Sequence, residues 1–138
     1  MSTRHPIIRM LVGLAGTALA LMLMAAPSYA GRGSSSKAGE ARVALSCTSG
    51  VKGKLQAKAR NGVIEMEFEL ESGRAGQTWA VSVTDNGTSV YAGNNVTAGP
   101  SGEFEVRRRI ANQAGTDNIA ATATLAGGAG SCSGALSV

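Results

Sequence analysis

The side chains best suited to bind a ligand are three consecutive arginines, Arg107, Arg108 and Arg109. The planar guanidinium fork of arginine binds carboxylate, phosphate and sulfate groups. In an extended strand, however, successive side chains point to opposite faces. Arg108 should therefore point away from Arg107 and Arg109, and the three cannot hold one anion together. We expect salt links to neighbouring strands, with an anion-binding site at Arg107 and Arg109 as the alternative.

Two further patterns are candidates for carbohydrate chemistry. Trp79 could stack on a sugar ring, but it stands alone and its neighbours at a spacing of two, Val81 and Val83, are apolar. We therefore expect Trp79 in the core, with a ligand platform as the alternative. Glycoside hydrolysis needs two carboxyls in different environments. This difference is not expected for four glutamates that share one face of a solvated strand, Glu65, Glu67, Glu69 and Glu71.

Histidine is absent outside the N-terminal segment, where His5 stands. Catalytic Ser-His-Asp or Cys-His groups therefore cannot form once that segment is removed, and the commonest general base near neutral pH is missing. Two cysteines alone cannot complete a zinc site of the usual nitrogen and sulfur type. The sequence thus predicts a protein that is not an enzyme and that has no catalytic residues, no metal site and no cofactor.

Residues 1–30 have the features of a cleaved signal peptide. Arg4 and Arg9 precede an apolar run over 11–26, and small residues occupy Ser28 and Ala30, the positions that a signal peptidase reads. We expect a secreted, extracellular protein with no membrane span after cleavage. Removal of Arg4 and Arg9 lowers the net charge from +4 to +2, which is too little to indicate a nucleic-acid partner.

The two cysteines, Cys47 and Cys132, are expected to form a disulfide, because exported proteins generally oxidise an even number of cysteines. It would join the first strand to the last. Closing a loop of this length contributes about 4–5 kcal/mol in the chain-entropy description. Two free thiols are the alternative.

The mature chain divides into a Gly/Ser-rich segment, 31–40, predicted to be a flexible leader, and a domain at 41–138 whose apolar residues recur with period two. Turn signals recur about every 8–12 residues, which is typical of an antiparallel sandwich. We predict an all-β fold of seven or eight strands. Its first strand would cover 41–47 and its last 131–138.

Two Asn-Gly pairs, at Asn61-Gly62 and Asn86-Gly87, predict β-hairpins with two-residue turns. The first turn would place residues opposite each other when their numbers sum to 123, with Lys58, Lys54 and Lys52 facing glutamates. Charge alternation and turn type then specify the same register. The second turn would set Val83 opposite Val90 and Val81 opposite Ala92. Tyr91 would face away from the core.

A strand at 103–111 should place apolar residues on one face and Glu103, Glu105, Arg107 and Arg109 on the other. Arg108 falls on the apolar face. Either a β-bulge resets the alternation at this point, or the strand has reached the rim of the sandwich, where a long side chain can extend into solvent.

The mature region resembles a group of small secreted actinobacterial proteins of unknown function. The resemblance rests on 73–79 (GRAGQTW), on 98–108 (AGPSGEFEVRR) and on 114–117 (AGTD). The outline also resembles immunoglobulin-like sandwiches, although the cysteines and Trp79 do not follow the antibody pattern. Neither resemblance implies an activity.

These observations predict a secreted, non-enzymatic binding or interaction module for a protein or cell-envelope component. The alternative is a carrier that holds a small apolar ligand in a cleft between the sheets, because a core rich in alanine leaves room for one.

Overall fold

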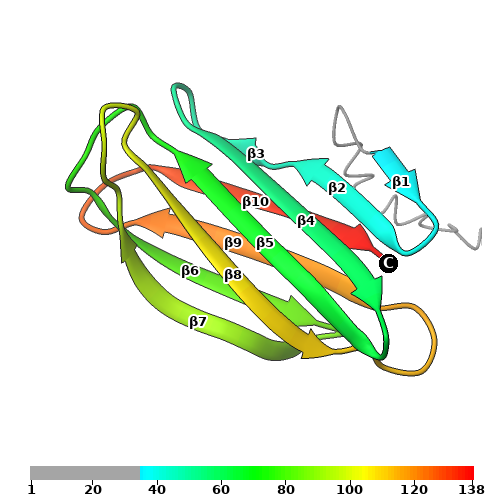
Figure 1. Ribbon diagram of the computed structural model, residues 1–138. Helices are drawn as coiled ribbons and strands as arrows, with labels where there is room; N and C mark the ends of the chain where they lie inside the picture. Colours follow the sequence, from blue (N-terminus) through cyan, green and yellow to red (C-terminus); the bar gives the residue numbers. More distant parts are fainter. Residues whose placement is uncertain (1–34) are drawn as a thin grey trace, which may run out of the picture.

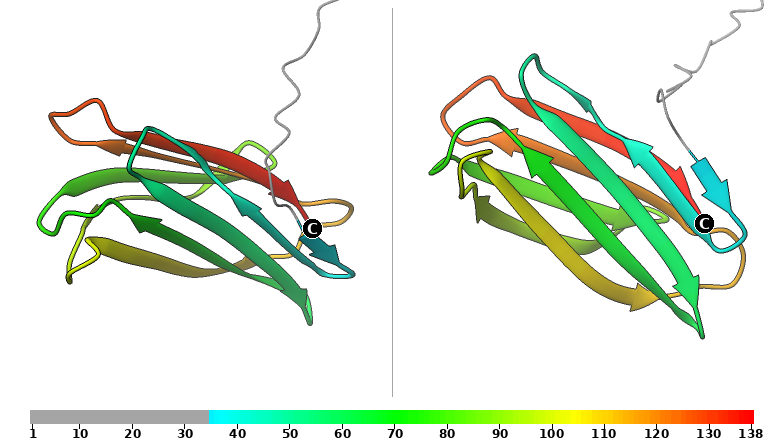
Figure 2. Two further views of the ribbon diagram at one scale, coloured as in Figure 1. Left: turned by 90° about the horizontal axis from the view of Figure 1, so that it is seen from above. Right: turned by 45° about the horizontal axis from the view of Figure 1, so that its top comes forward.

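The computed structural model describes residues 35–138, which form two packed antiparallel sheets and no helix (Figures 1 and 2). The signal peptide predicted at 1–30 lies outside the described residues. One sheet, here sheet A, has the order β1-β2-β4-β5-β8. Its strands are β1 (Ser35–Lys37), β2 (Glu40–Ala44), β4 (Lys52–Arg60), β5 (Val63–Glu71) and β8 (Glu103–Ala111).

The other sheet, sheet B, has the order β3-β10-β9-β6-β7. Its strands are β3 (Ser46–Cys47), β6 (Thr78–Asp85), β7 (Thr88–Val96), β9 (Asn118–Leu125) and β10 (Ser131–Ser137). The predicted antiparallel β-sandwich is confirmed. The seven or eight predicted strands correspond to β2 and β4–β10, and two short strands, β1 and β3, bring the total in the described residues to ten.

The first predicted strand is divided between the two sheets. β2 pairs with β4 in sheet A, whereas β3 pairs with β10 in sheet B. The buried Leu45 lies at the crossing, and its side chain fits between Gly53 and Gly134. A Cβ at either glycine would lie 2.7 Å from a Leu45 methyl carbon. These glycines therefore make room for the residue at which the chain leaves one sheet for the other.

The predicted leader is also more ordered than expected. Residues 35–37 form β1, an edge strand paired with β2, and Glu40 already belongs to β2. The expectation of a flexible leader is wrong for these residues, because their backbone groups complete the edge of sheet A.

The core lies between the sheets and is built from inward side chains of both. Its largest fully buried members are Trp79, Phe68, Leu55, Ile64 and Met66. The core position expected for Trp79 is confirmed. A Cβ at Gly130 would lie 2.8 Å from the Trp79 ring, so this glycine accommodates the indole.

None of residues 35–138 belongs to a helix with the length and apolar character needed to cross a bilayer.

The hairpin between β4 and β5 has the predicted register throughout. All nine facing pairs, from Lys52 opposite Glu71 to Arg60 opposite Val63, have numbers that sum to 123. Asn61 and Gly62 have φ values of 49° and 79°, as a primed turn requires. The inward apolar residues of β5 alternate strictly with glutamates. Turn geometry and side-chain pattern therefore agree, as the sequence predicted.

The hairpin between β6 and β7 follows the predicted register only next to its turn. Asp85 faces Thr88 and Thr84 faces Ser89, but the pairing then shifts by one residue, so that Val83 faces Tyr91 and Val81 faces Gly93. The predicted pairs of Val83 with Val90 and Val81 with Ala92 are wrong. The outward orientation expected for Tyr91 is wrong as well, because the shift turns its half-buried ring toward the core.

Candidate functional site

The outward side of sheet A is a charged face formed by β2, β4, β5 and β8. β4 contributes mainly lysines, β5 contributes glutamates, and β8 contributes two glutamates at one end and two arginines at the other. The pairing aligns these side chains in rows across the strands. We call the following residues the charged face: Glu40, Arg42, Lys52, Lys54, Gln56, Lys58, Glu65, Glu67, Glu69, Glu71, Glu103, Glu105, Arg107 and Arg109.

The outward side of sheet B differs completely. The only charged residue in its five strands is Asp85, which is buried. Its exposed positions carry small residues, among them Ala80, Ser82, Thr122 and Thr124. Charge is therefore concentrated on one of the two broad faces of the molecule.

The three arginines have three different environments. Arg107 forms salt bridges with Glu67, at 3.3 Å, and with Glu105, to which it also donates a hydrogen bond of 3.1 Å. These are the expected salt links. Arg109 faces Glu65 in the register, yet it forms no ion pair within 4.0 Å among the described residues.

Arg108 lies at the rim of the sandwich, as one of the two predictions stated. β8 pairs with β5 without a register shift, so no bulge resets the alternation. The guanidinium carbon lies 4.6 Å from the centre of the Tyr91 ring, and Nη1 donates a 2.8 Å hydrogen bond to the Arg107 carbonyl. This cation–π contact joins the edge strand of sheet A to that of sheet B.

Two pockets carry opposite net charges. The first, of about 470 Å³, is called the arginine pocket; on the charged face its three cationic and two anionic side chains give a net charge of +1, because the Arg108 guanidinium lies on the Tyr91 ring instead. The second, of about 610 Å³, is called the acidic pocket; its two cationic and four anionic side chains give −2. The arginine pocket is lined by Gln56, Lys58, Glu65, Met66, Glu67, Arg107, Arg108 and Arg109. The acidic pocket is lined by Lys52, Gly53, Lys54, Glu69, Leu70, Glu71, Ala98, Gly99, Glu103, Phe104 and Glu105.

Two glutamates between these pockets share a hydrogen bond and have different affinities for a proton. The pKa of Glu67 is raised, mainly by its hydrogen bond to Glu69 and then by burial and by repulsion from Glu105. Burial alone would raise the pKa of Glu69, but the hydrogen bonds from Lys54 and Glu67 outweigh burial and lower it. The similar environments expected along this row of glutamates are therefore not found at these two positions.

Three carboxylates, those of Glu67, Glu69 and Glu105, have oxygens within 4.8 Å of one another. Two cationic side chains already pair with them. The Lys54 Nζ lies 2.9 Å from Glu69 and 3.7 Å from Glu67, and Arg107 forms salt bridges with Glu67 and Glu105. We therefore interpret the group as part of the salt-bridge network of the charged face.

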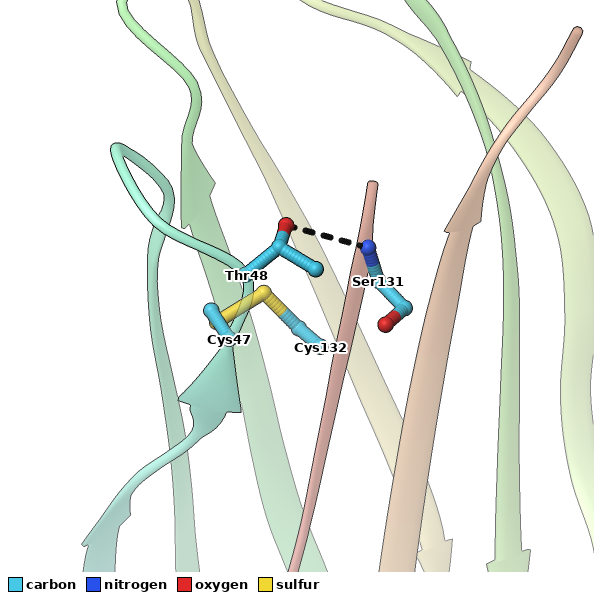
Figure 3. Close-up of a disulfide and its surroundings, with 4 residues drawn as sticks. All are labelled: Cys47, Thr48, Ser131 and Cys132. Carbon is cyan, nitrogen blue, oxygen red and sulfur yellow. Dashed lines mark hydrogen bonds between the residues drawn. A yellow bond between two sulfur atoms is a disulfide. The ribbon is translucent and has the colours of Figure 1, made fainter. Parts of the chain in front are cut away.

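The predicted disulfide is present, but it lies within one sheet (Figure 3). Cys47 of β3 faces Cys132 of β10, and their Cα atoms are 4.0 Å apart. Next to it, the backbone N–H of Ser131 donates a 3.3 Å hydrogen bond to the Thr48 hydroxyl. The bridge joins the last strand to β3, because the first predicted strand is divided at Leu45. It therefore fastens an edge strand to sheet B.

Sequence reasoning missed one cluster, the pair of buried carboxyls of Asp85 and Asp117. Asp85 adjoins the predicted turn at Asn86-Gly87, and Asp117 immediately precedes β9, yet both side chains are only 1% exposed. A signal was available: the tripeptide Thr-Asp-Asn occurs at 84–86 and again at 116–118. The two copies contact each other, because Asn86 Oδ1 accepts 3.1 Å hydrogen bonds from the backbone and side-chain nitrogens of Asn118.

The space between the sheets, where a carrier would hold an apolar ligand, is filled by fully buried side chains, among them Trp79, Phe68 and Leu55. Trp79 therefore offers no exposed ring face to a ligand. The carrier function stays a prediction that no structural observation favours.

Comparisons of the chain with protein-family models, with curated protein sequences and with solved structures find no match, so no function is carried over from a relative.

Proposed function

We propose that the protein is an exported, non-enzymatic interaction module that docks a protein or cell-envelope component through the charged face. The observation that carries this proposal is the separation of charge on that face, where one pocket has a net charge of +1 and the other −2. Arranged charge of this kind orients a partner and speeds encounter more than it adds affinity. The partner that fits presents an acidic group to the arginine pocket and a basic group to the acidic pocket.

Arg109 is the residue best placed to bind such a partner. Its guanidinium is exposed and forms no ion pair within the described residues, whereas Arg107 is engaged by two glutamates. An arginine that forms no ion pair within the protein breaks no such interaction when its guanidinium binds a carboxylate or phosphate of a partner. We therefore assign the anion-binding role to Arg109, with Lys58 as a second cation in the same pocket.

Export and the immunoglobulin-like resemblance belong to the same proposal. The disulfide is compatible with an oxidising, extracellular environment. Sandwiches of the immunoglobulin type include adhesion modules, in which a sheet face or a loop cluster carries the contact.

The test measures retention of the purified protein on cell-envelope fractions from the source organism, at 50 and 300 mM NaCl. Binding through the charged face predicts that Arg109→Gln reduces retention at low salt at least threefold and that high salt has a similar effect. Thr122→Glu is the matched control, because it also lowers the net charge by one unit but acts on the outward side of sheet B. Equal losses in both variants would show that total charge, and not the charged face, determines retention.

A separate assay addresses the absence of catalysis. The purified protein is tested for hydrolysis of glycoside, ester and peptide substrates. The proposal predicts no turnover above the blank. A turnover abolished by Glu67→Gln or Glu69→Gln would overturn the non-enzymatic assignment, because these two carboxyls are the ones whose proton affinities differ on the charged face.

A further inference from the structure

Asp85 and Asp117 form a contact that is independent of the charged face. Asp85 is the last residue of β6, and Asp117 immediately precedes β9. Each is 1% exposed, and the carboxyl of Asp117 lies close enough to raise the pKa of Asp85. An ionised carboxylate can only accept hydrogen bonds, so the two carboxyls can bond to each other directly only when one of them carries a proton.

Among the residues that the structure describes, no cation compensates the pair. Within residues 35–138, no lysine or arginine forms a salt bridge with either aspartate. Asp85 Oδ1 is buried and has no hydrogen-bond partner, while Asp117 Oδ1 accepts a 3.3 Å hydrogen bond from the backbone N–H of Gln113. Two ionised carboxylates in this enclosed position would repel each other and lose their hydration.

The pair stands where four segments meet at one end of the sandwich. The backbone of Asp117 exchanges two 3.0 Å hydrogen bonds with Val138, which follows β10. The N–H of Asn86, in the β6–β7 turn, donates a 3.0 Å hydrogen bond to the carbonyl of Asn118. The β6–β7 turn, the β8–β9 loop, the start of β9 and the end of β10 thus lie together at one end of the sandwich (Figure 1).

We infer that Asp85 and Asp117 form a proton-dependent clasp, which holds this end of the sandwich closed while the pair keeps one proton and loosens it when both carboxyls ionise. The polar side chains that neighbour the pair, Asn86, Gln113 and Asn118, are uncharged. In the chain used for the test, Val138 also carries the α-carboxyl group. That group has an ordinary pKa of about 3.5 and keeps a constant charge above pH 5.

The direction of the pH effect follows from the raised affinity of Asp85 for a proton. Burial raises the pKa of Asp85 above its ordinary value of 3.8, and repulsion from Asp117 and the hydrogen bond between the carboxyls raise it further. The stabilisation is complete below that ordinary value and is lost as the pH rises through the raised pKa. Between the two values the folded protein holds one more proton than the unfolded chain, so the unfolding constant rises about tenfold per pH unit.

The experiment measures urea denaturation of the disulfide-bonded protein from pH 4 to pH 9, together with the ¹³C chemical shift of the Asp85 carboxyl carbon. We expect stability to fall with rising pH across the same interval in which that carbon titrates. In Asp117→Asn, the amide can donate a hydrogen bond to an ionised Asp85 without a bound proton. The fall in stability over this interval should therefore disappear. The control, Glu103→Gln, changes an exposed carboxyl and should keep the wild-type slope.

Three results would overturn the inference. First, the ¹³C shift could show that the Asp85 carboxyl of the wild-type protein has a pKa near the ordinary value for aspartate. This measurement requires no variant. The Asp117→Asn variant, or Asp85→Asn should the first fail to fold, could keep the wild-type dependence on pH. Finally, addition of 1 mM CaCl₂ at pH 8 could raise the melting temperature of the wild type and not of Asp117→Asn, which would identify a metal ion, and not a proton, as the cation of the pair.

Discussion

The two Asn-Gly hairpins have nearly identical turns but different registers. Asn61 and Asn86 have φ values of 49° and 48°, and the glycines that follow have 79° and 83°. β4 and β5 keep one register over nine pairs, whereas β6 and β7 shift by one residue after two pairs. The comparison shows that a primed turn fixes only the pairs next to it. Farther along the strands, register depends on which side chains gain by facing the core.

The side chains of β5 and β7 explain this difference. From Ile64 onward, each apolar residue of β5 is followed by a glutamate, so a one-residue shift would bury charge. In β7 the adjacent residues Val90 and Tyr91 are both apolar, and no charged residue opposes a shift. The observed register turns the larger ring inward, where it packs on the core and under Arg108.

The largest expected effect comes from the covalent bond that only sheet B has. Replacing both Cys47 and Cys132 by alanine should lower the free energy of unfolding by about 4–5 kcal/mol, because the unfolded chain regains the entropy of a long loop. Urea denaturation measures this change. The reduced wild-type protein should match the double variant, and a loss below about 1 kcal/mol would contradict the prediction.

Removal of the ring that accompanies the register shift should have the next largest effect. Tyr91→Ala should cost about 2 kcal/mol, since a half-buried aromatic ring and its stacking with Arg108 are both lost. Tyr91→Phe keeps the ring and removes only the hydrogen bonds with Asn95, so it should cost about 0.5 kcal/mol. Equal costs would show that the hydroxyl, and not the ring, determines the inward position.

Matched substitutions in the two turns separate backbone strain from side-chain contacts. Asn61→Ala should cost about 1 kcal/mol, because alanine disfavours a positive φ. Asn86→Ala should cost about 1 kcal/mol more, because Asn86 Oδ1 also accepts two hydrogen bonds from Asn118. Thermal denaturation of the two variants gives the difference, and identical melting temperatures would contradict it.

The smallest expected effect is that of the charged pairs in sheet A. Lys54→Gln should cost about 0.5 kcal/mol at low salt and nothing measurable in 1 M NaCl. Lys52→Gln should cost less still, since the Lys52 side chain is 81% exposed against 32% for Lys54, and its ion pair is longer. Urea denaturation at both salt concentrations checks this. A large loss of stability that salt does not reduce would show that these pairs stabilise the fold and do not only specify the register.

The features predicted correctly from the sequence are those that either a local sequence pattern or a covalent bond specifies. The strict alternation of β5, the turn at Asn61-Gly62 and the pairing of Cys47 with Cys132 were each specified by residues close in sequence or unique in type. The prediction failed where tertiary contacts between distant residues decide the outcome. The shift in β7 brings Tyr91 against the core and Arg108, and the first strand divides at Leu45, which two distant glycines accommodate.

The candidate site was predictable only in part. The sequence identified the charged rows and the separation of Arg108 from its two neighbours. It did not show that Arg109, unlike Arg107, forms no ion pair among the described residues, because the side-chain positions of Glu65 and Arg109 are not specified by register alone. Nor did it identify the buried aspartates, because two residues 32 positions apart meet only once sheet B has formed.

The disulfide of sheet B also has a mechanical consequence. Tension applied between the segment before Cys47 and the end of β10 passes through the sulfur bridge, because that covalent path is shorter than the path along the 85 positions between the cysteines. The intervening strands, including most of the charged face, would then carry no load. If the protein acts as the interaction module proposed above, tension between these two segments leaves the shape of the charged face unchanged.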